Sequence, residues 1–130
     1  LTVAIERDLS GTHAMQALFK DIIKMDGVYG LIFFSHEGRV LFESTDPHWI
    51  SLPQGFRDAD KLLPVLQKMR EADFVYENGR IYVRATERGY LLVIMGPLVS
   101  IAMVKLNCDI ILPQLKIDKP GGKLKGLFRR

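Results

Sequence analysis

The residues of this chain that could carry chemistry are few and widely spaced. His13, His36 and His48 fall at an expected helix start, turn and loop, and no two have the spacing of a zinc motif. The single cysteine, Cys108, lies in an apolar helical pattern, which favours a buried thiol over a nucleophile paired with a distant histidine. We therefore expect surface histidines and a core cysteine.

Two further patterns resemble functional motifs only in composition. The segment PGGKLKG, residues 120–126, lacks the Gly-x-x-x-x-Gly-Lys-Ser/Thr spacing of a phosphate loop, and no predicted strand leads into it. Asp58 and Asp60 form a carboxylate pair, but helix capping explains them better than acid–base chemistry. With no visible nucleophile–base set, the sequence predicts no enzyme and no catalytic, cofactor-binding or metal-binding residue.

The net charge of +3 is unevenly distributed along the chain. Residues 116–130 hold six basic residues and one acidic residue and carry +5, which leaves −2 on residues 1–115. Because the body is not basic, nucleic acid is not expected as a partner. A lone cysteine cannot close an internal disulfide and fits a reducing, cytoplasmic location.

Two segments carry residues suited to contact a partner. Trp49, in a loop with two prolines, either folds back onto the sheet or anchors a partner. In the basic tail, Leu124, Leu127 and Phe128 stand at i, i+3 and i+4 among lysines and arginines. Such a segment docks on a partner groove or an anionic membrane, or stays a soluble tail too short to be helical alone. Membrane contact is expected only through this tail.

Hydrophobic periodicity predicts three helices and five strands. The helices are expected from a cap at Ser10 or Thr12 to Met25, from Asp58 or Asp60 to about Ala72, and from Gly96-Pro97 until Pro113. The strands are expected over residues 28–35, 40–44, 73–77, 80–86 and 90–95. Pro64 lies inside the second of these helices, which should therefore begin near it or kink there.

The turns between these strands decide the topology. Gly38, a type I′ turn at Asn78-Gly79, and Gly89 close tight connections, which require antiparallel neighbours. Strands 28–35 and 90–95 are apolar on both faces and should lie side by side at the centre. Strands 40–44 and 73–77 then form the edges, with the first and third helices on one face and the second on the other. The predicted fold is an α+β sandwich around a five-stranded antiparallel sheet.

Two segments resemble the roadblock family, the small domain of dynein light chains and gliding-motility regulators. MDGVYGLIFFSHEGRVLFES, residues 25–44, resembles that family's helix end, Gly-Val-x-Gly, apolar strand, glycine turn and second strand. GRIYVRATERGYLLVIMGPLVSIAMVKLN, residues 79–107, resembles its last two strands and closing helix. The resemblance covers residues 10–115, flanked by an N-terminal extension, 1–9, and the basic tail, 116–130. Pro64 and the tail depart from the pattern.

The resemblance implies a non-enzymatic homodimer that acts as an adaptor or regulator. Roadblock domains pair through the second helix and the following strand, which joins two sheets edge to edge, and many bind a Ras-like small GTPase or scaffold a larger complex. The implied dimer surface is Leu62, Leu66, Met69, Phe74, Val75 and Tyr76. Independently, an edge strand carrying residues 74–76 is prone to aggregate unless it is paired or covered, and a two-fold contact would pair it.

The alternative function is a small-molecule sensor module of the PAS-like or GAF-like type. Such a module needs a cavity between the sheet and its helices, with polar groups converging on a ligand. The densely apolar strands of this sequence supply no such groups. We therefore rank the sensor below the adaptor.

Overall fold

The computed structural model describes residues 2–45 and 59–115, with side chains described from His13 in the first range and from Asp60 in the second. Helices and strands follow the predicted order. They are α1 Thr2–Ile23, β1 Val28–Ser35, β2 Val40–Thr45, α2 Ala59–Leu66, β3 Glu71–Tyr76, β4 Gly79–Ala85, β5 Gly89–Met95, α3 Ile101–Ile111 and the 3-10 turn η2 Leu112–Leu115.

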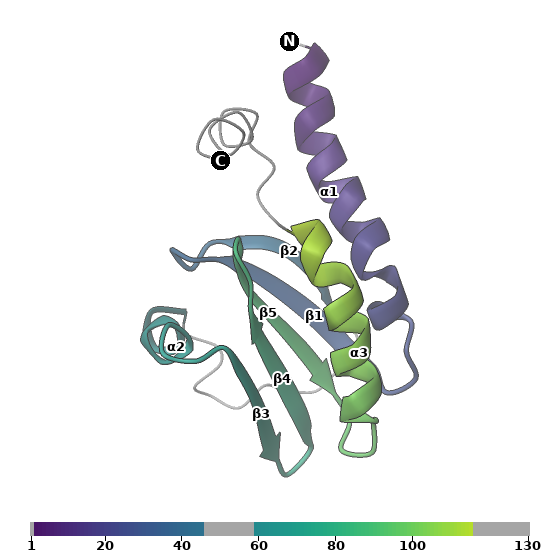
Figure 1. Cartoon of the computed structure of the whole chain (residues 1–130), viewed down its shortest axis with the longest axis vertical. Helices are drawn as coiled ribbons and strands as arrows, with labels where there is room; N and C mark the ends of the chain where they lie inside the picture. The colour runs from purple at the N-terminus through teal and green to yellow at the C-terminus, as the bar shows by residue number, and fades with distance from the viewer. Residues whose placement is uncertain (1, 46–58, 116–130) are drawn as a thin grey trace, which may run out of the picture.

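The five strands form one antiparallel sheet in the order β2-β1-β5-β4-β3. β1 and β5 lie side by side at its centre, and β2 and β3 are its outermost described strands, which confirms the predicted arrangement. Every residue of β5 is buried, as is β1 from Gly30 onward. In Figure 1, α1 and α3 lie over one face of the sheet and α2 over the other.

One apolar core lies on each face of the sheet, which gives the predicted α+β sandwich. On the first face Phe19 of α1 packs with its ring centroid 5.8 Å from Phe33 and 5.4 Å from Phe42. The helical residues buried there are Met15, Phe19, Ile22, Val104, Cys108 and Ile111. On the second face Leu62 and Leu66 of α2 pack on residues of β1, β4 and β5. The predicted core position of Cys108 is confirmed.

The first helix begins much earlier than the sequence pattern predicts. We expected a cap at Ser10 or Thr12, but α1 starts at Thr2, so the boundary expected at residue 10 falls inside the helix. Gly11 is the weakest helix former near this point, and a glycine inside a helix costs only about 1 kcal/mol. The helix ends as expected, because Gly27 adopts a φ of 85° just beyond it.

The second helix is shorter than predicted. It ends at Leu66 rather than near Ala72, and Asp60 lies inside its first turn rather than capping it, while Asp58 lies outside the described residues. Pro64 has no N–H to bond the carbonyl of Asp60, which weakens the helix from within. The chain leaves α2 through tight turns, and residues 71–72 pair with β4 instead.

The third helix begins later than predicted. The sequence placed Pro97 at its first position, but residues 96–99 form a turn and Ser100 is the N-cap of α3. The Ser100 hydroxyl accepts a hydrogen bond from the Met103 backbone N–H at 3.3 Å, which satisfies one of the free donors of the first turn. A serine cap thus overrides the preference of proline for a helix start.

Glycine serves two different purposes in the hairpins. Gly38 adopts the expected positive φ of 92° in the β1–β2 turn. The β3–β4 turn is not the predicted type I′, because neither Asn78 nor Gly79 has positive φ. Gly79 is needed for space instead, since a Cβ there would lie 2.7 Å from the Met95 carbonyl oxygen and 2.9 Å from the Tyr76 hydroxyl oxygen.

Candidate functional site

The β3 end of the sheet is the part of the described surface best suited to extend the sheet. β3 forms six consecutive pairs with β4, from Glu71 opposite Arg84 to Tyr76 opposite Gly79, without any register shift. Among the described strands, β4 is its one neighbour. A regular strand at the end of a sheet presents backbone donors and acceptors in the spacing that another strand requires.

The side chains of β3 alternate between two environments. Ala72, Phe74 and Tyr76 pack against the core beneath α2. Glu71 and Asp73 point to the opposite face, where α1 and α3 lie, and Val75 follows the same alternation. Val75 is 68% exposed, the most exposed large apolar side chain among the described helices and strands. This valine is therefore the apolar group that β3 offers to a partner.

The six residues expected to form the dimer surface are not equivalent. Leu62 and Leu66 are 5% and 1% exposed because they pack on the chain's own sheet. Met69, Phe74 and Tyr76 are half-buried against the same core. Val65, which the sequence analysis did not select, is 45% exposed on α2. Val65 follows Leu62 by three residues but lies about 100° around the helix from Leu66, so it falls at the edge of the face that the two leucines bury.

A polar network attaches β3 to the neighbouring strand and to α3. The Tyr82 hydroxyl donates a hydrogen bond to the Glu71 carboxylate at 2.5 Å and accepts one from Arg84 at 2.8 Å. Arg84 also pairs with Asp109 at 2.5 Å, and the Lys105 ammonium lies 3.0 Å from the Glu71 carboxylate. Glu71, the first residue of β3, is thus held in place by side chains of both β4 and α3.

This network shifts the pKa values of its members in opposite directions. The hydrogen bond from Tyr82, and then the one from Lys105, lowers the pKa of Glu71 below its ordinary value. Burial, and then the hydrogen bond to Glu71, raises the pKa of Tyr82 well above its usual range. Glu71 is therefore an anion and Tyr82 a neutral donor at physiological pH, which keeps their bond intact.

A second ion pair holds the middle of β3. The Arg80 guanidinium donates to both carboxylate oxygens of Asp73, with nitrogen–oxygen distances between 2.9 and 3.2 Å. Such a two-point contact fixes the orientation of both side chains better than a single hydrogen bond does. Because Arg80 lies opposite Val75 in the strand pairing, the exposed valine stands beside an ordered polar pair.

Comparison with known proteins finds solved structures of the same architecture. The sequence matches no protein-family model and no curated protein. It is similar in structure to MglB of Myxococcus xanthus (TM-score 0.64, 13% identity, covering 88% of this chain and 96% of that one). The gliding protein MglB from Thermus thermophilus aligns with a TM-score of 0.63 at 13% identity, covering 78% of this chain and 84% of that one.

A third solved structure extends this likeness beyond the gliding proteins. The Roadblock/LC7 domain from Streptomyces avermitilis aligns with a TM-score of 0.55 at 16% identity, covering 78% of this chain and 97% of that domain. The chain has the roadblock fold. At these identities the likeness establishes the fold alone, and it confirms the architecture that residues 25–44 and 79–107 suggested.

Of the residues that could have carried catalysis, Cys108, His36 and His13 are described, and His48 lies outside the described residues. Cys108 is fully buried, and burial raises its pKa to about 12, which keeps the thiol protonated and unreactive. His36 is an exposed turn residue whose Nε2 donates to the Glu87 carbonyl oxygen at 2.9 Å. His13 is exposed on α1. Within residues 2–45 and 59–115, no three His, Cys, Asp or Glu side chains are grouped to hold a metal ion.

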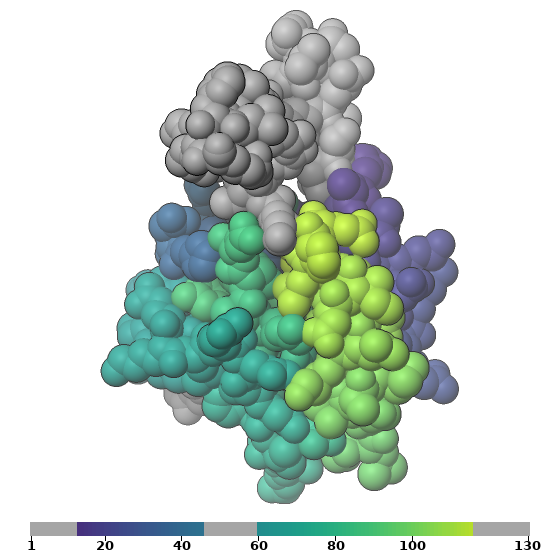
Figure 2. Space-filling model, in the orientation of Figure 1, coloured from purple at the N-terminus to yellow at the C-terminus, as the bar shows by residue number. Residues whose placement is uncertain are grey.

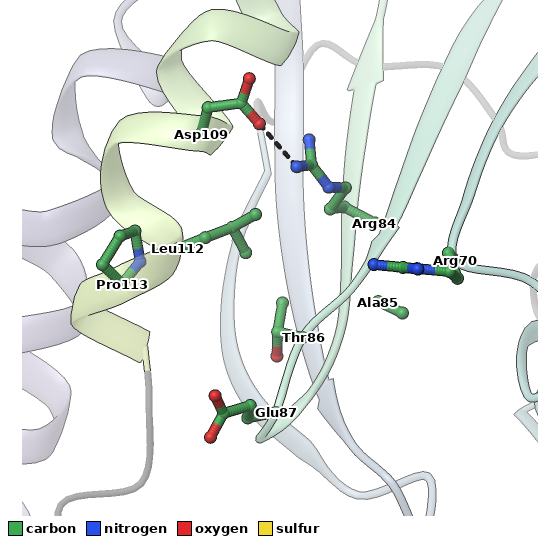
Figure 3. A pocket seen from close by; sticks show the side chains of 8 residues that line it. All are labelled: Arg70, Arg84, Ala85, Thr86, Glu87, Asp109, Leu112 and Pro113. Carbon is green, nitrogen blue, oxygen red and sulfur yellow. Dashed lines mark hydrogen bonds and ion pairs between the residues drawn. The ribbon is translucent and has the colours of Figure 1, made fainter.

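A surface pocket of about 450 Å³ lies between the C-terminal end of α3 with η2, the end of β4 with the turn that follows it, and Arg70 before β3. Figure 3 shows Arg84 paired with Asp109 on one side and the Arg70 guanidinium reaching in from the other. Glu87 adds a second acid, so the charges of the lining balance. This pocket lies at the margin of the sandwich, whereas buried side chains fill the space between sheet and helices. Within residues 2–45 and 59–115, the space between sheet and helices offers a sensor module no ligand cavity.

The remaining predicted contacts lie outside the described residues. These are Trp49 in the loop after β2 and Leu124, Leu127 and Phe128 in the basic tail. Their predicted roles remain predictions. Within the described ranges, no helix is long and apolar enough to cross a membrane.

Proposed function

We propose that this chain is a non-enzymatic adaptor or regulator that forms a homodimer through β3 and binds a Ras-like small GTPase. The observation that carries the proposal is the exposed Val75 on a regular, outermost strand of a roadblock fold. The sequence resemblance supports it, and so do the structural neighbours named as gliding proteins.

The dimer would form by pairing β3 of one chain with β3 of its partner around a two-fold axis. This geometry places each strand opposite a copy of itself and joins the two sheets edge to edge. Val75 would leave water on pairing, and Val65 on α2 would approach the partner's second helix. Leu62 and Leu66 would contribute indirectly, because they hold α2 against the sheet.

The GTPase would bind across the surface that the two copies of α2 build together. As the resemblance implies, this chain would supply no catalytic group; its one cysteine is buried and stays protonated. Any effect on nucleotide turnover would come from repositioning the partner's own switch loops. The chain would therefore discriminate between the GTP and GDP states of its partner.

The test combines solution mass with nucleotide-dependent capture. The wild-type chain, Val75→Asp and Val40→Asp are used as bait in lysate loaded with a GTP analogue or with GDP. Val40 is the matched control, since it is also an exposed valine on an outermost strand, at the β2 end. We expect a dimer that enriches a Ras-like GTPase in one nucleotide state, and loss of both properties in Val75→Asp alone. A wild-type monomer that ignores both states would overturn the proposal.

A further inference from the structure

The outer side of α3 carries an apolar stripe that no described element covers. Met103, Leu106 and Ile110 are 49%, 52% and 58% exposed and stand at i, i+3 and i+7. At 100° per residue they lie within about 60° of one another around the helix. Val104 and Cys108, on the inner side, are fully buried. Figure 2 shows α3 lying at the surface of the molecule.

The stripe differs from the other exposed apolar residues by being continuous. Val40, Val65, Val75 and Leu98 are each exposed on a different element or turn. Single exposed apolar side chains are common and need no explanation, whereas a row of them on one helix marks a contact surface. We therefore expect another segment to cover the three stripe residues.

The charged residues of α3 do not interrupt the stripe. Lys105 is directed to Glu71 and Asp109 to Arg84, so both project toward the sheet rather than toward the stripe. These ion pairs draw both charged side chains, which remain partly exposed, to the flank of the helix that faces the sheet, so the stripe itself consists of apolar residues. An occupant should therefore bring an apolar face of similar length.

We infer that the chain's own basic tail folds back and docks on this stripe. Leu124, Leu127 and Phe128 present three apolar side chains at helical spacing, as the stripe does. The described chain ends at Leu115, which directly follows α3 through η2, so the tail starts at one end of the surface it would cover. The two segments would form an antiparallel helical hairpin.

The lengths fit such a hairpin. The eleven residues of α3 are about 16 Å long at 1.5 Å per residue. Residues 123–130 would form a helix of about 12 Å on the same scale. Residues 116–122 remain as a connection with a reach of about 23 Å, and Gly121-Gly122 allows the sharp reversal. The tail thus spans the stripe without strain in its connection.

Tethering and charge both favour the tail over a separate molecule. A segment joined by a short flexible connection has an effective concentration in the millimolar range, which a free partner seldom reaches. The tail carries +5 and the rest of the chain −2. Lys123 and Lys125 would lie near the C-terminal end of α3, where the helix dipole and the exposed carboxylate of Asp109 favour cations.

The first measurement is hydrogen exchange of the tail amides in the full chain. We expect residues 124–128 to exchange about tenfold faster in Leu106→Asp than in the wild type, because the docked tail is protected. Val40→Asp is the matched control, since it places the same charge on an exposed valine of another element. Equal exchange rates in all three proteins would overturn the inference.

The second measurement changes residues of the tail and records the effect on the stripe. The methyl resonances of Met103, Leu106 and Ile110 are compared between the wild type and Leu124→Asp/Phe128→Asp, with Lys125→Gln as the control that keeps the apolar face. We expect all three resonances to shift in the double variant alone, by an amount unchanged on dilution and retained in the Val75→Asp background. Unchanged resonances would overturn the inference.

Two other outcomes would assign the stripe to a different occupant and equally overturn the inference. Shifts that grow with protein concentration, together with a rising solution mass, would make a second copy of the chain the occupant. A tail that gains protection solely when phosphatidylserine-containing vesicles are added, and not with phosphatidylcholine vesicles, would make a membrane its target. The docked tail predicts protection that is independent of both.

Discussion

The two ends of the sheet are built differently, although both are outermost strands. Where β2 pairs with β1, the register shifts between Phe33 and Phe34, so Leu41 of β2 is an extra residue there, and Phe42 is buried beneath α1. β3 runs through six regular pairs and exposes Val75. Bulges distort the edge that another strand would need, whereas a regular strand keeps it intact. The difference indicates which end is available for pairing.

The helix above each end reinforces this contrast. The long helix α1 contacts β2 and packs Phe19 onto Phe42. The short helix α2 covers the sheet next to β3 and holds Val65 at the surface. Among the described elements, only the short helix α2 covers the β3 end, and a regular strand there suits pairing with a partner strand.

The largest expected effect is a loss of stability when Leu66 is substituted, because this predicted interface residue belongs to the core. Leu66→Ala should lower the free energy of unfolding by about 3 kcal/mol, and Leu66→Asp by more, because Leu66 is 1% exposed. Denaturant unfolding measures both changes. Val40→Asp is the control and should change stability little, since Val40 is 49% exposed and lies outside the proposed interface. A stable Leu66→Asp protein of halved mass would instead place Leu66 in the interface.

The next largest effect is on dimer formation, which should depend on the β3 end of the sheet and not on the β2 end. Val75→Asp should raise the dimer dissociation constant roughly 100-fold, which corresponds to about 2.7 kcal/mol, because a charge replaces an apolar contact on β3. Val40→Asp should leave the dissociation constant unchanged. Sedimentation over a dilution series measures both variants. A larger loss in Val40→Asp would assign the pairing to β2.

A smaller effect should follow from removing one hydroxyl beside β3. Tyr82→Phe deletes the group that links Glu71 to Arg84 and should cost about 1 kcal/mol of unfolding free energy. Local amide exchange should accelerate in β3 and not in β2, since the network contacts the β3 end alone. Equal acceleration in both strands would show that the network stabilises the whole sheet.

The smallest effect is a pH dependence from Glu71. Its folded-state pKa lies below the unfolded value near 4.5, so its contribution is present above that pH and is lost as the pH falls through the lower folded-state pKa. Because Glu71 is 37% exposed, the contribution should be less than about 1 kcal/mol.

Glu71→Gln should remove this dependence. Unfolding free energies of both proteins, measured from about pH 7 to about pH 3, should differ near neutrality and converge in acid. A difference that grows as the pH falls would contradict the assigned sign, and a constant difference would mean that the hydrogen bond does not depend on the carboxylate's charge.

Sequence patterns predicted the architecture because strands buried on both faces are recognisable by apolar residues at successive positions. Strands 28–35 and 90–95 are apolar on both faces, and only a central position covers both. Helix boundaries were less predictable, because they depend on single competing interactions. Ser100 outcompeted Pro97 as the start of α3, and pairing with β4 drew residues 71–72 out of the predicted helix.

The candidate surface was only partly predictable for a related reason. Leu66 and Val75 are both apolar residues in the predicted pairing region, and composition does not distinguish them. The structure does, because Leu66 faces the chain's own sheet and Val75 faces solvent. Which apolar residues remain for a partner depends on how completely the monomer buries its own, and that follows from the packing of α2 across strands distant in sequence.

The most direct test of the central claim is to observe contacts between two copies of β3. In a sample mixing two isotope-labelled forms of the chain, intermolecular nuclear Overhauser effects report protons of one copy that lie close to the other. If β3 pairs with its copy, cross-strand contacts should appear between residues 71–76 of the two copies, centred on a two-fold axis. Contacts arising from residues 40–45, or a monomeric mass with no intermolecular contact, would contradict this pairing.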